Sequence, residues 1–185
     1  MKILFRLALA LSLTISAMSP ALAGNDSVHT NVSLDIPAGA QLTAPDNITT
    51  VQNLVLDASN ISFDSNLNAS GKVSILWKGI TNSQNGLEVV VYRSDIGGTA
   101  GAALKRDLTV YGAPGPGGDT TAIIAGLYAA GKVLGDIPMD KPEAFAVTNQ
   151  PGSCIFEVQL GLNSPSSHGT GTASTVLTFV GASIK

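Results

Sequence analysis

Apolar and polar side chains alternate most clearly in the stretch SCIFEVQLGLN, residues 153–163. The apolar positions fall on one side of an extended chain: Cys154, Phe156, Val158, Leu160 and Leu162. The opposite side carries polar groups, among them Glu157, Gln159 and Asn163. A period of two is typical of a half-buried β-strand. The stretch therefore predicts a strand over residues 154–162, with Cys154 buried as a small hydrophobic side chain.

Similar strand signals recur along the chain between turn-forming residues. We predict further strands at residues 28–36, 51–56, 61–63, 72–78, 87–93, 104–111, 143–148 and 173–184. The pair Asn85-Gly86 favours a tight turn with positive φ, which predicts a hairpin between 72–78 and 87–93. The strand at 173–184 is apolar on both faces, which indicates burial from both sides, within the domain or at an interface.

Two later segments interrupt this pattern. Glycine and proline dominate residues 112–118, and we predict that this segment forms neither a helix nor a sheet ladder. Asp119 is a candidate N-cap for a short helix over 120–134. The apolar stripe of that helix would contain Ile123, Leu127, Ala130 and Leu134. Gly126 and Gly131 weaken a helix, so a strand or loop stays open there.

Many short strands separated by turn residues favour an all-β fold, an immunoglobulin-like antiparallel β-sandwich with one short helix near 120–134. Cys154 is the single cysteine, so the paired cysteines of antibody-type domains are absent. Trp77 lies in the middle of a predicted strand and is the candidate aromatic residue between the sheets. We predict a single sandwich domain over residues 24–185.

The amino-terminal residues 1–23 have the pattern of a secretory signal peptide. Lys2 and Arg6 provide a positive start, an apolar run follows, and Ala21-Leu22-Ala23 is a small-x-small cleavage site. We therefore expect a secreted, periplasmic or cell-surface protein. Because no later segment approaches 18 uninterrupted apolar residues, we expect no transmembrane anchor.

Charge and composition exclude several function classes. Charged residues make up 12% of the chain and the formal net charge is −3, so there is no basic cluster for nucleic acid. Residues 126–133 fit a phosphate-binding loop except that Val133 replaces the hydroxyl residue that would bind Mg²⁺. Residues 64–68 begin like a calcium loop but lack the later glycine and glutamate. Both segments are better interpreted as chance matches.

Catalytic constellations are also missing from the sequence. A nucleophile–base pair needs a histidine beside a hydroxyl or thiol, and we predict that His29 and His168 are solvated surface side chains. The carboxylates are scattered without a pairing signal for glycoside hydrolysis. We predict no enzyme activity, no catalytic residues, no cofactor and no metal site.

The leading hypothesis is an exported structural or adhesive surface protein, a fimbrial-type subunit that assembles with itself. Its assembly strand would be residues 28–36, where one face carries Val28, Thr30, Val32, Leu34 and Ile36. Nine residues span about 30 Å of strand, which is enough to complete another sheet by strand addition. The alternative is that this strand and the C-terminal strand pair with each other inside one monomer.

A second hypothesis from another class is a secreted ligand-binding module for carbohydrate. Tyr92, Arg93 and Tyr111 would form an aromatic and polar patch, because both tyrosines lie opposite the apolar face of their strands. Aromatic residues make up only 5% of the chain, so ordinary sheet-surface positions are the favoured interpretation.

Overall fold

The computed structural model describes residues 38–99, 105–168 and 171–185. These residues belong to one compact unit, Ile36–Lys185. The signal peptide predicted for residues 1–23 and the assembly strand predicted for residues 28–36 lie outside the described residues.

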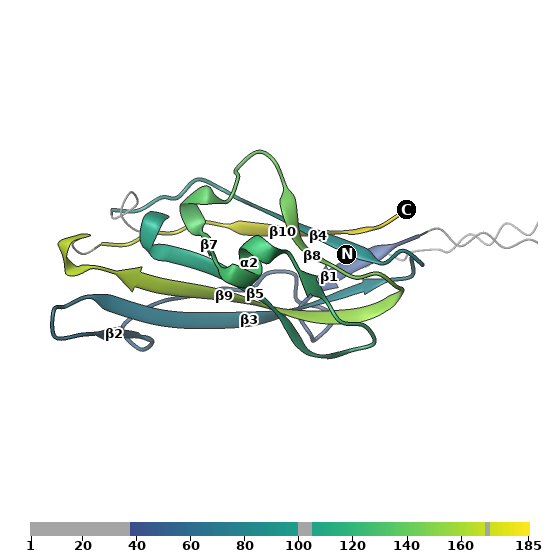
Figure 1. Cartoon of the computed structure of the whole chain (residues 1–185), viewed down its shortest axis with the longest axis horizontal. Helices are drawn as coiled ribbons and strands as arrows, with labels where there is room; N and C mark the ends of the chain where they lie inside the picture. Colours follow the sequence, from purple (N-terminus) through teal and green to yellow (C-terminus); the bar gives the residue numbers. More distant parts are fainter. Residues whose placement is uncertain (1–37, 100–104, 169–170) are drawn as a thin grey trace, which may run out of the picture. The chain divides into compact units, whose positions relative to one another are not determined.

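Two antiparallel sheets form a β-sandwich, and Figure 1 shows them as separate layers. The first sheet has the order β1 (Ala40–Thr43), β3 (Ala69–Thr81), β9 (Gly152–Ser164), β5 (Leu108–Gly118) and β7 (Lys132–Val133), and β2 (Ile61–Phe63) also pairs with β3. The second has the order β10 (Leu177–Ser183), β4 (Leu87–Arg93), β8 (Glu143–Val147) and β6 (Ile123–Ile124). The helical elements are short: α2 (Gly126–Ala130), η1 (Leu134–Asp136) and η2 (Ser166–His168). The predicted all-β sandwich is confirmed.

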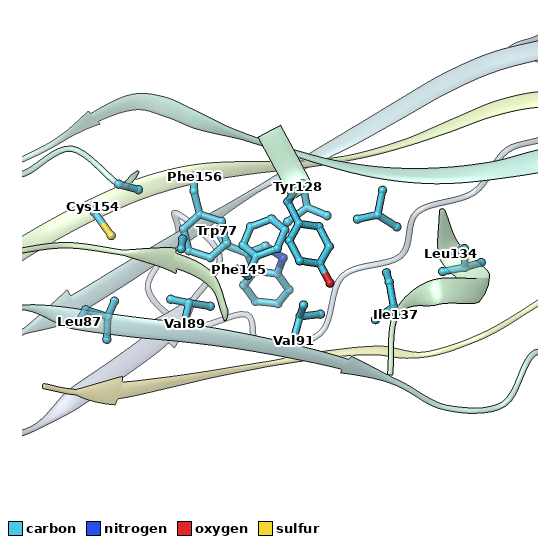
Figure 2. Close-up of a cluster of buried hydrophobic side chains, with 14 of the residues drawn as sticks. Trp77, Leu87, Val89, Val91, Tyr128, Leu134, Ile137, Phe145, Cys154 and Phe156 are labelled. Carbon is cyan, nitrogen blue, oxygen red and sulfur yellow. The ribbon is translucent and has the colours of Figure 1, made fainter. Parts of the chain in front are cut away.

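Aromatic side chains fill the space between the two sheets (Figure 2). The ring of Phe145 is fully buried and lies 4.8 Å from Tyr128, 5.6 Å from Phe156 and 5.1 Å from Phe179, measured between ring centroids. Trp77 is buried and its ring lies 6.3 Å from that of Phe179. Such tilted and edge-on pairs add to the free energy gained from burying the rings. The prediction that Trp77 is a core aromatic is confirmed.

Several strands lie where strong alternation of apolar and polar side chains predicted them. β4 has the predicted bounds, and its burial alternates with Leu87, Val89 and Val91 on the inside. β9 contains the predicted strand, with Cys154 and Phe156 pointing inward. The strands predicted at 61–63, 72–78 and 143–148 correspond to β2, β3 and β8.

The predicted hairpin between 72–78 and 87–93 is wrong. β3 pairs with β9 in the first sheet, whereas β4 pairs with β10 and β8 in the second. The turn at residues 82–86 therefore joins the two layers. Leu87 packs across the layers onto β3: a Cβ added to Gly79 would lie 2.3 Å from its Cδ2 atom. Each strand is apolar on its inner face, so packing the strands face to face buries both apolar faces. The free energy gained by this burial outweighs that of pairing the two strands edge to edge.

The prediction that residues 112–118 form no ladder is also wrong, because β5 continues through them to Gly118. Gly112, Ala113 and Pro114 pair with β9, and a register shift follows before Gly118. β7 pairs with β5 only at Thr109 and Val110, so the rest of β5 is an edge of the sheet. Proline is tolerated on an edge strand because its missing N–H can face solvent.

The helix predicted over 120–134 is reduced to α2, flanked by β6 and β7. Of the predicted stripe only Leu134 is buried, and it lies in η1; Ile123, Leu127 and Ala130 are exposed, and Tyr128 is the buried residue of α2. Gly131 follows with φ of 98°, which ends the helix. Asp119 is not the cap, since its carboxylate accepts hydrogen bonds from the backbone and hydroxyl of Ser153.

Three other predicted strands differ at their ends or are missing. β5 begins only at Leu108, because residues 105–107 are helical. β10 is shorter than the predicted 173–184, and Val180 on its outer face and Val176 just before it are exposed in this chain rather than buried within the domain. Residues 51–56 form no strand in the structure.

Part of the strand order follows the immunoglobulin arrangement, whereas β2, β6, β7 and β8 have no counterpart in it. In that fold, strands A, B, E and D form one sheet, and C, F and G the other. β1, β3, β9 and β5 take the places of A, B, E and D, and β4 takes that of C. β10 lies next to β4 and so takes the place of F. Among the described residues, no strand fills the place of G on the other side of β10.

Candidate functional site

The three residues predicted to contact carbohydrate are not brought together. Tyr92 lies on β4 in the second sheet and Tyr111 lies on β5 in the first. Each alternates with inward-facing valines, Val91 and Val110, so the two tyrosines project from opposite outer faces of the sandwich. A single ligand patch made of Tyr92, Arg93 and Tyr111 is therefore not formed.

Arg93 is buried, with 7% of its surface exposed. Its guanidinium donates hydrogen bonds to the carbonyl oxygens of Ser94 (3.0 Å) and Gly135 (3.1 Å). These bonds connect the end of β4 to η1. The side chain is therefore a connection within the fold, rather than the exposed ligand contact that its position beside Tyr92 predicted.

Tyr111 packs on the outer face of the first sheet. A Cβ added to Gly131 would lie 2.3 Å from its ring, and a Cβ added to Gly161 would lie 3.1 Å from it. The Nζ atom of Lys72 lies 5.7 Å from the ring centroid, within cation–π range. The ring thus covers two glycines that lack side chains of their own.

Asp107 joins two residues that are far away in the sequence. Its carboxylate is almost completely buried and accepts a hydrogen bond from Ser164 Oγ at 2.6 Å. His168 Nδ1 lies 2.7 Å from the same oxygen. His168 is exposed at the surface, as predicted, and its ring is also held in place by Asp107. In a catalytic triad the histidine lies between the serine and the aspartate. Here the serine and the histidine both contact Asp107, so that order is not formed.

Glu143 is the acceptor for a second, partly buried group of polar side chains. Tyr128 donates its hydroxyl hydrogen to Glu143, and Lys132 Nζ lies 2.6 Å from both carboxylate oxygens. Burial, together with the neighbouring carboxylate, raises the pKa of Tyr128 well above its usual value. Because its amine is bound by Glu143, Lys132 is not free to bind a phosphate, as the near-match at residues 126–133 would require.

Alkaline pH should destabilise the fold through Tyr128. Below pH 10 the tyrosine is protonated in both the folded and unfolded chains, so it adds no pH dependence. Above pH 10 only the unfolded chain ionises, and the free energy of unfolding falls by about 1.4 kcal/mol per pH unit. Urea unfolding at pH 9–12 should give a smaller slope for Tyr128→Phe than for the wild-type chain. Tyr92→Phe, on an outer face, is the control, and equal slopes for all three proteins would contradict this prediction.

Cys154 is buried as predicted and lies on the inner face of β9. Burial raises the pKa of its thiol. Its sulfur lies beside Gly79, where an added Cβ would approach within 3.2 Å. A buried, protonated thiol packs like a small apolar group, which means that the native chain offers little reactivity to thiol reagents at this position.

A shallow apolar depression of about 250 Å³ lies over β8 and β6. Ile123, Ala144 and Val147 line it, together with one carboxylate, that of Glu88. Within the described residues no group of histidine, cysteine and carboxylate side chains could hold a metal ion. The depression contains too few convergent polar groups to indicate a catalytic or small-molecule site.

The most distinctive feature is an unfinished side of the sandwich, between β3 and β10. On the β3 edge, β1 pairs with residues 78–81 and β2 pairs with residues 69–71. Residues 72–77 have no ladder partner on this side among the described residues. The opposite border is β10, whose only ladder partner in the described part of the chain is β4. We call this region, between residues 72–77 and β10, the open side.

Apolar side chains gather around the open side. Phe179 and Leu177 face inward from β10 and remain only partly buried, as does Ile75 on β3. Many of the exposed large hydrophobic residues belong to the segments that border it: Ile48, Val51, Val55, Phe63, Leu67, Val176 and Val180. Strand addition uses this combination, in which an unpaired backbone edge lies next to apolar residues that are incompletely covered. No local sequence pattern indicated this site, because it depends on which strands become neighbours.

No known protein family matches this chain, and neither does any curated protein. None of the helices in the described residues is long and apolar enough to cross a membrane.

Proposed function

We propose that this protein is an exported structural subunit that assembles with copies of itself by strand addition. Residues 28–36 of one copy act as the donor strand, and the free edge of β10 in the next copy is the acceptor. The observation that supports this most is the edge of β10 that has no ladder partner among the described residues, where the immunoglobulin arrangement would have its last strand. Leu42 of β1 packs near Gly181 at one end of this edge without forming a ladder.

The donor and acceptor match in length and in chemistry. β10 has seven residues with an unpaired edge, and the alternating segment at 28–36 is slightly longer. The face that carries Val32 and Leu34 can cover the partly buried ring of Phe179, while the polar face stays in water. The charge-poor composition and the signal peptide predicted at residues 1–23 agree with export and surface assembly.

The start of the described chain also supports pairing between copies. β1 runs antiparallel to β3, with Ala40 opposite Thr81, the last residue of β3. Gly39 is bound there by the side chain of Asn82 at 2.6 Å. The described chain therefore begins at the end of the sheet, and the proposed donor segment comes directly before it in the sequence.

The experiment compares two substitutions in the exported full-length chain. Leu34→Asp puts a charge on the apolar face of the donor, whereas the control, Ser33→Asp, puts it on the polar face. We expect Ser33→Asp to form the same higher oligomers or fibres as the wild type, seen by gel filtration and negative-stain microscopy, and Leu34→Asp to remain monomeric. A wild-type chain that is monomeric at high concentration, or equal assembly of both variants, would refute the proposal.

A further inference from the structure

Residues 51–56 cover the open side in an unusual way. Exposure alternates along them, with Val51 at 75% and Val55 at 56% exposed, while Leu54 and Leu56 pack against the core. Despite this strand-like pattern, no hydrogen bond links their backbone to the backbone of another described residue. The Gln52 side chain makes the contact instead, because its Nε2 donates to the carbonyl oxygen of Leu76 at 2.7 Å.

Chain direction places this segment beside the unpaired part of β3. β1 runs along residues 81–78 of β3, and β2 runs along residues 71–69 in the same direction. The chain between β1 and β2 must therefore pass residues 72–77, and the bond from Gln52 to Leu76 fixes it there. Residues 51–56 fill the place of a strand without forming its ladder.

Two self-contained turns bound the segment. On the β1 side, Asp46 accepts hydrogen bonds from the backbone N–H groups of Ile48 (2.9 Å) and Thr49 (2.8 Å). On the β2 side, Asp57 accepts from the backbone N–H of Ser59 at 2.8 Å, and its own carbonyl accepts from that of Ile61 at 2.9 Å. Asn60 also donates from its Nδ2 to the carbonyl oxygen of Val55 at 2.8 Å. Departure of the segment therefore breaks this bond and the bond from Gln52 to Leu76, while the ladders of β1 and β2 stay paired.

We infer that residues 51–56 are a replaceable cover, which the donor strand of a second copy displaces from the open side. This inference rests on the proposed function and names the chain's own segment that the donor must replace. The donor can offer what the cover does not, since a paired strand supplies backbone hydrogen bonds as well as apolar side chains. Leu54 and Leu56 leave the core, and donor side chains of the alternating face, such as Val32 and Leu34, take their place.

The test uses a thiol as a reporter of the cover. Leu54→Cys places a thiol on the inward face, and Val55→Cys, one residue further on, places it on the outward face as a control. Cys154 is buried and gives little background. The probe is a synthetic peptide of residues 25–36, added to the monomeric fraction of the exported full-length chain. Amide hydrogen exchange of β10 is followed in the same samples.

We expect the peptide to protect the amides of β10 and to raise the labelling rate of Leu54→Cys by maleimide about tenfold or more, as a buried position becomes accessible. Labelling of Val55→Cys should not change. A peptide with Leu34→Asp should have neither effect. If Leu54→Cys fails to fold, Leu56→Cys reports the same inward face.

The other outcomes separate the two proposals. Protection of β10 without faster labelling of Leu54→Cys would overturn the cover and leave strand addition standing. If β10 gains no protection and labelling stays constant, both the cover and the proposed function fail. Equal acceleration at Leu54→Cys and Val55→Cys would indicate general loosening of the loop and would also overturn the inference.

Discussion

Replacing Phe145 with alanine should lower the free energy of unfolding by about 3–5 kcal/mol, because it removes a fully buried ring and leaves a cavity. This ring contacts aromatic rings from three other elements: Tyr128 on α2, Phe156 on β9 and Phe179 on β10. Its loss therefore weakens the packing between both sheets. A loss of this size is a large part of the total stability of about 5–15 kcal/mol that is usual for a domain.

Equilibrium unfolding in guanidinium chloride, followed by the fluorescence of Trp77, would measure the effect. The matched control is Phe63→Ala, because the ring of Phe63 on β2 is 66% exposed. We expect the control to change the free energy of unfolding by less than about 0.5 kcal/mol. Similar losses for the two variants would contradict the central role of Phe145 in the core.

The second large effect is expected at the corner between the two sheets. Gly86 has φ of 95°, and a Cβ added to it would lie 1.9 Å from the carbonyl oxygen of Thr148. Thr148 is fixed in turn, because its backbone N–H donates to Leu87 O and its Oγ1 accepts from Leu87 N. Gly86→Ala must therefore shift main-chain atoms, and we expect it to lower the free energy of unfolding by about 2–4 kcal/mol.

Gly126→Ala is the control for the corner, since no atom lies within 4 Å of the added Cβ in α2. Alanine favours a helix more than glycine does, so this variant should gain up to about 1 kcal/mol. Thermal unfolding of both variants, followed by circular dichroism, would test the pair. A melting temperature for Gly86→Ala at or above that of Gly126→Ala would refute the described corner.

Local alternation was sufficient to locate strands whose two faces differ strongly. Phe156 and Val158 alternate with Glu157 and Gln159, and β9 lies where that pattern predicted it. Residues 87–93 behave in the same way, because every second side chain is apolar and faces the core. At these positions, the residues that form the alternating pattern are also the residues that decide which face of the strand is buried.

It was harder to predict from the sequence which strands pair with one another. The Asn85-Gly86 turn correctly indicated a reversal of the chain, but it did not specify whether β3 and β4 would pair edge to edge or pack face to face. Gly79 contributed to the outcome, because the missing side chain leaves room for Leu87 from the other sheet. Such a contact depends on the distance between layers, which a local pattern does not contain.

The buried polar groups could not be predicted for a similar reason. Asp107 binds Ser164 and His168, and these residues are 57 and 61 positions away in the chain. The open side likewise depends on a combination of distant elements, β3 and β10. The failed strand prediction at 51–56 is the informative case, since exposure does alternate along the segment but no ladder forms.

The two borders of the sandwich differ in their capacity to bind another strand. The outer part of β5 contains Pro114 and Pro116, which lack the N–H donors that a neighbouring ladder needs. β10, on the other side, contains no proline. In the proposed assembly, a subunit with β10 as the acceptor and one donor segment connects to the next in a single way, and the two surfaces in contact are different. Repeating such a head-to-tail contact gives an unbranched filament with two unlike ends, or a ring if the rotation closes.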